Sequence, residues 1–119
     1  MAQSNAIMTL SNGEITIKVD LIQTKKSAAI LRALNHKLRQ QIIKLLNDSK
    51  KMTVTEIYVK LRLEQSVASQ HLAILRLAQL VTTKRDGKFI FYSVNYERID
   101  EINDFIIDLV GKTPSKERE

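Results

Sequence analysis

Cysteine is absent from this chain of 119 residues, tryptophan is absent too, and the chain has one proline and three glycines. Without cysteine there can be no disulfide, no thiolate metal site and no thiol redox sensor. So few prolines and glycines argue against long flexible linkers. No apolar run approaches the roughly 18 residues of a membrane-spanning helix. The first residues lack a basic-then-apolar signal pattern, so we expect a cytoplasmic protein with no membrane partner.

Acidic residues are in the minority. The chain has 19 Lys and Arg against 13 Asp and Glu, a formal charge of +6 and a pI of about 9.7. This balance favours a polyanionic partner such as nucleic acid, or an anionic membrane surface, without being specific. The length suits one domain. We expect it at residues 21–111, between an N-terminal arm or hairpin at 1–20 and a charged tail at 112–119.

The segment at residues 65–78 organises the chain. Its apolar positions follow steps of four, three and three, which lie along one stripe of a helix. This buried edge comprises Ala68, Leu72, Leu75 and Ala78. The other face carries Ser66, Ser69, Gln70 and Ala73, with His71 at its margin. Small and amide side chains let a helix approach another surface closely and still offer hydrogen bonds.

The segments on either side of this helix complete a pattern. Thr53 and Glu56 form a capping box that opens a helix at residues 54–61, and residues 62–64 form the turn. Strands at 81–85 and 88–94 flank Asp86-Gly87, a two-residue turn that needs positive φ at both positions. Helix, turn, helix and a basic hairpin predict a mainly α, winged helix-turn-helix domain with a small β-hairpin wing.

The remaining segments predict three more helices. Asp20 caps a helix that runs to about Leu34 and is apolar on more than one side. A second begins at Asn35, with Leu38, Ile42, Leu45 and Leu46 as its core stripe, and the last spans about 96–111. Before them, Asn12-Gly13 suits a hairpin of residues 7–10 and 14–19, and a single extended arm is the alternative.

The first and last helices carry more apolar surface than one small core needs. We therefore expect a homodimer that is paired through these two helices. A twofold dimer also reads a longer DNA site than one winged helix can. The predicted interface residues are Leu21, Ile22, Ile102, Phe105, Ile106 and Leu109.

Taken together, these motifs resemble the ArsR-type (ArsR/SmtB) winged-helix repressors, over about residues 31–110. Residues 34–46 resemble the second helix of that family, with Arg39 at its characteristic arginine position. Residues 54–57 resemble the start of its third helix, residues 65–75 its recognition helix, and residues 80–93 its wing. One departure is Gln79, where the family usually has glycine. The resemblance implies a dimeric DNA-binding transcriptional regulator, a repressor, and not an enzyme.

The metal sites of the resembled family do not carry over. Where that family has two cysteines at the start of its third helix, this chain has Thr53 and Thr55. Where the last helix supplies Asp and His ligands, this chain has Tyr96, Arg98, Leu109 and Lys112, which form no plausible zinc set. We therefore expect no metal and no cofactor.

Double-stranded DNA is the expected partner, with the recognition helix in the major groove. Gln65, Ser66, Val67 and Gln70 are the candidates for base edges, and Ser69 and His71 for phosphates. The basic wing residues Lys84, Arg85 and Lys88 are expected at flanking phosphates or the minor groove. His71 could instead bond the wing backbone. Arg39 could contact DNA or form a structural ion pair.

Two other functions stay open at this point: a winged-helix protein-interaction module, and an architectural protein that coats DNA without reading it. An enzyme is not expected, because the chain has no thiol, no Gly-rich phosphate loop and no catalytic triad. The inducer is unknown. A small molecule, a protein antagonist and constitutive repression all remain possible, and the operator sequence cannot be read from the chain.

Overall fold

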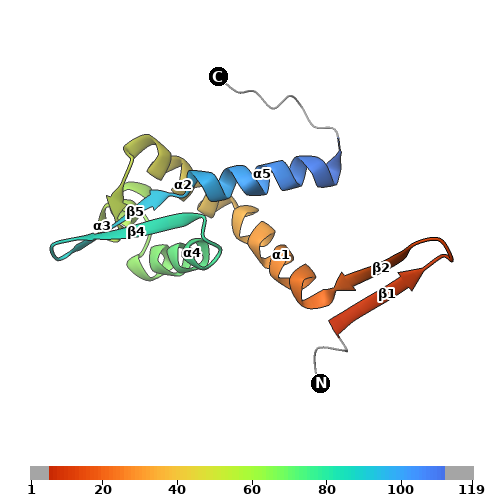
Figure 1. Ribbon diagram of the computed structural model, residues 1–119. Coiled ribbons are helices and arrows are strands. Elements are labelled where there is room, and N and C mark those ends of the chain that lie inside the picture. The colour runs from red at the N-terminus through yellow and green to blue at the C-terminus, as the bar shows by residue number, and fades with distance from the viewer. Residues whose placement is uncertain (1–5, 112–119) are drawn as a thin grey trace. The chain divides into compact units, whose positions relative to one another are not determined.

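The computed structural model describes residues 6–111, so the predicted tail at 112–119 lies outside the described residues (Figure 1). The chain divides into two compact units, residues 1–32 and 33–119, which are described separately here. The division falls after residue 32, within the helix predicted to follow Asp20, and every residue from 21 to 29 is exposed. Within the described range, no helix has both the length and the apolar character needed to cross a membrane.

The first unit begins with a β-hairpin, β1 (Ile7–Ser11) and β2 (Thr16–Asp20). The strands pair antiparallel with Ser11 opposite Thr16, which confirms the hairpin over the single extended arm. The connection is longer than the two residues expected. Asn12 Oδ1 accepts hydrogen bonds from the backbone N–H groups of Glu14 and Ile15 at 2.9 and 3.0 Å. This side-chain turn closes the longer loop, as Asn commonly does.

The helix α1 (Leu21–Leu34) follows β2 directly. Asp20 Oδ1 accepts from the backbone N–H groups of Ile22 and Gln23 at 3.0 and 3.2 Å, so Asp20 is the predicted cap. An Asp at this position satisfies donors that the first helical turn leaves unpaired.

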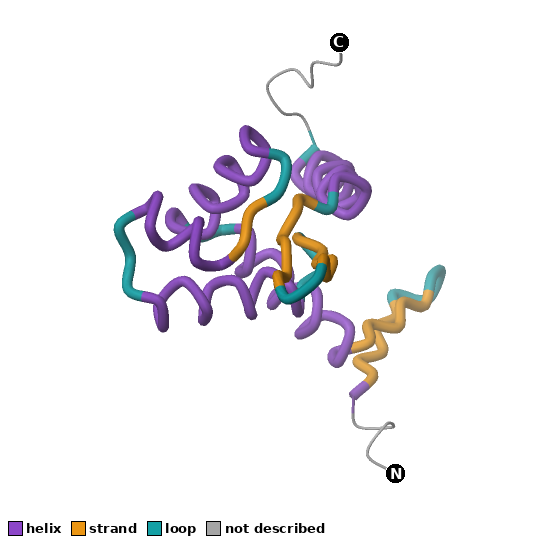
Figure 2. Tube along the Cα trace, turned by 90° about the vertical axis from the view of Figure 1, so that its left-hand side faces the viewer, coloured by secondary structure: helices purple, strands orange, loops and turns teal. Residues whose placement is uncertain are grey.

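The second unit contains the elements of a winged helix-turn-helix, and this confirms the predicted fold class. Its elements are α2 (Lys37–Ser49), β3 (Met52–Thr53), α3 (Val54–Leu61), α4 (Gln65–Leu77), β4 (Val81–Asp86), β5 (Phe89–Val94) and α5 (Tyr96–Val110). The antiparallel sheet has the order β3-β5-β4. Its short strand β3 was not predicted. Figure 2 shows β5 leading almost directly into α5.

The core of this unit gathers around the inner edge of α4. The largest fully buried side chains come from α2, α3, α4 and the start of the wing: Ile42, Leu46, Ile57, Leu72, Leu75 and Leu80. The predicted edge of α4 is confirmed, because Ala68 and Ala78 are buried with the two leucines. Burying one such leucine or isoleucine contributes about 1.5–3 kcal/mol, so this edge fixes which side of α4 faces outward.

Each of the helices α2, α3 and α4 begins after a defined N-cap residue. The second helix begins at Lys37, two residues later than predicted, and His36 is its N-cap. The N-cap of α4 is Glu64, the last residue of the predicted turn, and its side chain makes no capping hydrogen bond. The capping box of Thr53 and Glu56 is confirmed.

The wing turn lies one residue further along than predicted. Asp86 pairs with Phe89, so the connecting residues are Gly87 and Lys88. Of these two, only Gly87 has positive φ, at 65°. The hairpin therefore has one more strand pair than predicted, Asp86 with Phe89, and its turn needs a left-handed residue only at Gly87.

The end of α4 adopts the left-handed conformation at Gln79, where the resembled family has glycine. Gln79 has φ 64°. Its N–H donates to the Arg76 carbonyl and the N–H of Leu80 donates to the Leu75 carbonyl, both at 2.9 Å. These two bonds define a Schellman motif, which glycine usually closes because a Cβ is strained at this φ.

We predict that Gln79→Gly stabilises the protein by roughly 0.5–1 kcal/mol, since it removes this strain and keeps both hydrogen bonds. Urea unfolding of the two proteins measures the difference. The control is Ala73→Gly, at an exposed position inside α4, which should lose about 1 kcal/mol. If Gln79→Gly and Ala73→Gly lower the free energy of unfolding equally, Gln79 is not strained.

Candidate nucleic-acid interface

Over residues 65–70 the outer face of α4 is exposed, polar and uncharged, and the exposed Arg76 follows in the last turn of the helix. Gln65, Ser66, Ser69 and Gln70 are exposed, and Val67 is half-buried beside them. The pairs 65/69 and 66/70 are four residues apart, so their side chains lie together on one helical face. Glutamine amides and serine hydroxyls both donate and accept hydrogen bonds, and a glutamine amide can pair with adenine through two bonds at once. Burial of the opposite edge of this helix therefore leaves the four predicted base-edge candidates, and the phosphate candidate Ser69, exposed or at the margin.

The wing carries the predicted basic residues near its tip, and all three are exposed. Lys88 lies in the turn, while Arg85 and Lys84 occupy the next positions back along β4. Neighbouring residues of a strand point to opposite faces, so Lys84 and Arg85 serve different sides of the wing. Arg85 Nη1 donates to the Gly87 carbonyl at 3.5 Å, which turns its guanidinium toward the tip. The helix α4 contacts β4, so the helix and the basic wing are neighbours in the fold.

One basic residue near the wing was missed. The ammonium of Lys51 lies 4.7 Å from the ring centroid of Phe91 on β5. This neighbourhood exists because β3 pairs with β5, and a two-residue strand leaves no pattern in the sequence. A second lysine, Lys88, lies over Phe89 at 5.6 Å.

Arg39 is buried, with 8% of its surface exposed, and its guanidinium is engaged inside the protein. Its Nε donates to the carbonyl of Ala33 at 2.7 Å, and its Nη1 donates to Nδ1 of His71 at 3.1 Å. This burial disagrees with a direct DNA contact for Arg39. Its side chain ties the start of α2 to α4 instead.

His36 is a site residue that the sequence did not reveal. Its Nδ1 accepts from the backbone N–H groups of Leu38 and Arg39 at 3.2 and 3.5 Å, which caps α2. Its ring also lies against that of His71, with 4.8 Å between centroids. The two histidines are 35 positions apart along the chain, so their spacing gave no signal.

His71 is half-buried at the margin of the outer face of α4. Burial lowers the pKa of His71 from its usual 6.5, and the neighbouring His36 and Arg39 lower it further. Both effects disfavour the imidazolium form. The Nδ1 atom of His71 is hydrogen-bonded to Arg39, and not to the wing backbone.

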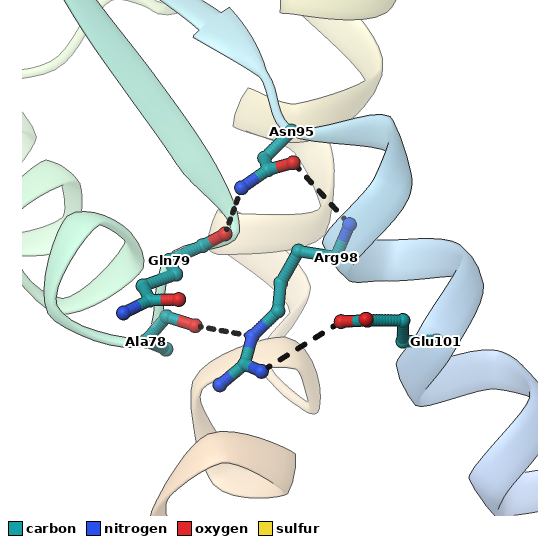
Figure 3. A network of polar contacts seen from close by, with 5 residues as sticks. All are labelled: Ala78, Gln79, Asn95, Arg98 and Glu101. Carbon is teal, nitrogen blue, oxygen red and sulfur yellow. Dashed lines mark hydrogen bonds and ion pairs between the residues drawn. The ribbon is translucent and has the colours of Figure 1, made fainter.

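The far end of α4 is tied to the start of α5, as Figure 3 shows. Asn95 Oδ1 caps α5 through the N–H of Arg98 at 3.2 Å, and its Nδ2 donates to the Gln79 carbonyl at 3.0 Å. Arg98 Nε donates to the Ala78 carbonyl at 3.2 Å, and its Nη1 lies 3.9 Å from Glu101 Oε1. Two of these contacts act on the carbonyls of Ala78 and Gln79 at the end of α4, so α5 restrains the orientation of that helix.

The residues predicted for the dimer interface divide into two groups. Four are exposed: Leu21, Ile22, Phe105 and Leu109, at 42%, 44%, 47% and 66%. Ile106 is half-buried. Ile102 is a correction, because only 7% of it is exposed and its side chain belongs to the core of the second unit. The position is one helical turn from Phe105 in sequence, so periodicity alone could not separate the two.

The positions that correspond to the cysteine ligands of the resembled family serve another purpose. Thr53 Oγ1 accepts from the N–H of Glu56 at 3.2 Å, and Glu56 Oε1 accepts from the N–H of Thr53 at 2.9 Å. Thr55 is exposed. In residues 6–111, no three His, Asp or Glu side chains gather in a way that could hold a metal ion.

A polar helix face beside a basic hairpin, on a helix-turn-helix core, defines a winged helix-turn-helix DNA-binding protein. Comparison with known proteins supports this class. The family model described as "Bacterial regulatory protein, arsR family" matches residues 36–83. The transcriptional repressor PagR of Bacillus anthracis is 32% identical over 85 residues, covering 71% of this chain and 85% of PagR.

Solved structures agree with the sequence comparison. HlyU from Vibrio cholerae N16961 aligns with a TM-score of 0.57 and 31% identity, over 73% of this chain and 94% of HlyU. NolR from Sinorhizobium fredii aligns with a TM-score of 0.62 and 28% identity, over 89% of this chain and 99% of NolR. The chain belongs to the arsR family of bacterial regulatory proteins, which confirms the resemblance. It is a DNA-binding transcriptional regulator and not an enzyme.

The lowered pKa of His71 predicts a specific dependence of stability on pH. Between the folded pKa and 6.5, the unfolded chain binds more protons at this residue than the folded protein does. The free energy of unfolding therefore rises with pH in this window, and the contribution is lost as pH falls from 6.5 through the folded pKa. Urea unfolding at a series of pH values should show a steeper acid loss for the protein than for His71→Asn. If the free energy of unfolding falls equally with pH in both proteins, the lowered pKa of His71 is contradicted.

Proposed function

We propose that this regulator binds a pseudo-palindromic operator as a homodimer and represses transcription there. In each half-site α4 enters the major groove, and the basic wing lies on flanking phosphates or in the minor groove. The observation that carries the proposal is the exposed, uncharged hydrogen-bonding face of α4 next to the three exposed cations of the wing. The protein is placed in the cytoplasm, where bacterial DNA lies.

The roles within the half-site follow from side-chain chemistry. Gln65, Ser66 and Gln70 meet base edges, and Val67 meets a thymine methyl group. Ser69 and His71 bond phosphates, which fix the register without reading sequence. Lys84, Arg85 and Lys88 neutralise phosphates, so they supply affinity that weakens with salt.

Homodimerisation is supported by apolar surface that each unit leaves uncovered. On α1, Leu21 and Ile22 are exposed, and an isolated helix of this length is marginal in water. The hairpin before it pairs Met8 with Val19 and Leu10 with Ile17, so one of its faces is apolar. On α5, Phe105 and Leu109 are exposed in the same way. A second copy of the chain covers these surfaces and sets two copies of α4 at the spacing of successive major grooves.

The direction of regulation rests on the relatives. PagR is named a transcriptional repressor, whereas HlyU of Vibrio cholerae, 37% identical over 70 residues, is named a transcriptional activator. Repression is the simpler outcome for a dimer that occupies an operator. Neither relative's target genes carry over to this protein.

Selection from random duplexes, at two salt concentrations, should enrich a pseudo-palindrome that the protein binds more weakly at the higher salt. The variant Gln65→Ala with Gln70→Ala should lose preference for that site by roughly 1–3 kcal/mol per lost contact and keep salt-sensitive binding. The control is Gln41→Ala, an exposed glutamine on α2, which should read the same site as the unaltered protein.

Each other result points to a different function. Salt-sensitive binding without an enriched sequence identifies an architectural DNA-coating protein. No binding at either salt identifies a protein-interaction module.

Phe105→Asp should convert the dimer to monomers that bind the selected operator weakly, because a carboxylate in an apolar interface would lose its hydration. Sedimentation and operator binding measure the two effects. Asn103→Asp places the same charge at another exposed position of α5 and should leave the dimer intact. A Phe105→Asp protein that stays dimeric and binds tightly would place the interface elsewhere.

A further inference from the structure

A buried guanidinium joins three parts of the second unit. Arg39 lies on α2, its Nε donates to a carbonyl of the last turn of α1 at Ala33, and its Nη1 donates to His71 on α4. Burying a charge costs free energy unless its hydrogen bonds are satisfied. These two acceptors are therefore built into the site, and neither is an incidental surface contact.

The bond between Arg39 and His71 determines which nitrogen of the imidazole carries hydrogen. A guanidinium has five N–H donors and no acceptor. Nδ1 of His71 must therefore accept, which requires that it carry no proton. The neutral ring then holds its hydrogen on Nε2. The lowered pKa of His71 agrees with a neutral ring, since burial, His36 and Arg39 all disfavour a second proton.

His36 supports this arrangement from the start of α2. By capping the backbone N–H groups of Leu38 and Arg39, it fixes the helical turn from which the Arg39 side chain extends. Its ring packs against the ring of His71 at 4.8 Å and 44°. The charged and titratable groups that act on His71 are thus Arg39 and His36, both from the start of α2, while the neighbours on its own helix, Gln70 and Ser69, are uncharged.

We propose that Arg39 is a positioning residue for DNA binding: it bonds Nδ1 of His71, so that His71 presents Nε2–H as a neutral donor to a DNA phosphate beside Ser69. This inference rests on the proposed function. It gives Arg39 a role in DNA binding without a DNA contact. It also makes His71 a phosphate ligand without charge, so its contribution does not come from counterion release.

The first experiment uses the full chain and needs no DNA. Long-range nitrogen–proton NMR spectra distinguish a protonated ring nitrogen from an unprotonated one. At neutral pH, Nδ1 of His71 should be unprotonated and Nε2 protonated. In Arg39→Met, which has similar bulk and no donor, His71 should become a mixture of both tautomers. A protonated Nδ1 in the unaltered protein overturns the inference.

The second experiment measures affinity for the selected operator at several salt concentrations. The variant His71→Asn keeps an acceptor near the position of Nδ1 but is too short to place a donor at the position of Nε2. It should lose at least about tenfold in operator affinity at every salt concentration, while the dependence of affinity on salt stays unchanged. His71→Gln carries an amide donor near Nε2 and should recover most of that loss. Lys88→Ala, in contrast, should make the salt slope shallower. An equal loss for Asn and Gln, or a shallower slope for Asn, overturns the donor role.

The third experiment combines the two sites. If Arg39 acts through His71, Arg39→Met should weaken operator binding alone and add little in the His71→Asn background. If the factors by which Arg39→Met and His71→Asn reduce operator affinity multiply in the double variant, the positioning role is overturned. The ring-nitrogen spectrum and the two His71 variants decide the inference even where Arg39→Met does not fold. Failure of the unaltered protein to bind any selected duplex overturns the proposed function, whereas binding with the wrong tautomer overturns only this inference.

Discussion

The burial of one edge of α4 is the constraint on which the rest of the second unit depends. A helix of 13 residues is marginal alone in water, so packing must hold it. Leu72 and Leu75 supply that packing at 1% exposure or less, against α2, α3 and β4. Because a helix has one fixed angular spacing, burial of this edge forces Ser66 and Gln70 outward. The surface that we propose reads DNA is thus a consequence of the core.

Hydrophobic contact alone does not set the orientation of α4, because it has no preferred direction. Two polar ties supply direction. Near its middle, Arg39 bonds His71; at its end, Asn95 and Arg98 bond the carbonyls of Gln79 and Ala78. Hydrogen bonds have narrow distances and angles, so ties at two heights restrict both rotation and tilt. The elements α2 and α5, which carry no base-reading residue in the proposal, therefore determine how accurately α4 is presented.

The periodic features of the sequence predicted the fold. The contacts between residues far apart in the chain could not be predicted from the sequence. The spacing of Ala68, Leu72 and Leu75 gave the inner edge correctly, because burial repeats with the helix. The strand β3 left no signal, since two residues have no period and their partners lie about 40 positions away. The pairing of Arg39 with His71, 32 residues apart, likewise depends on how α2 and α4 cross. The positions of the glycines also did not reveal where the backbone turns left-handed, because Arg62 and Gln79 adopt the positive φ that glycine usually supplies.

In the proposed half-site, affinity for DNA and the reading of its sequence fall to different elements of the second unit. Residues 65–75 of α4 include no lysine, arginine or acidic residue, while Lys84, Arg85 and Lys88 gather near the tip of the wing. Cations bind the phosphates of any sequence, so a charged reading helix would strengthen correct and incorrect sites alike. Amides and hydroxyls gain free energy only where base edges match them, and they leave unpaired groups where they do not. A neutral His71, held by a buried arginine, keeps this face uncharged while still offering a phosphate one hydrogen bond.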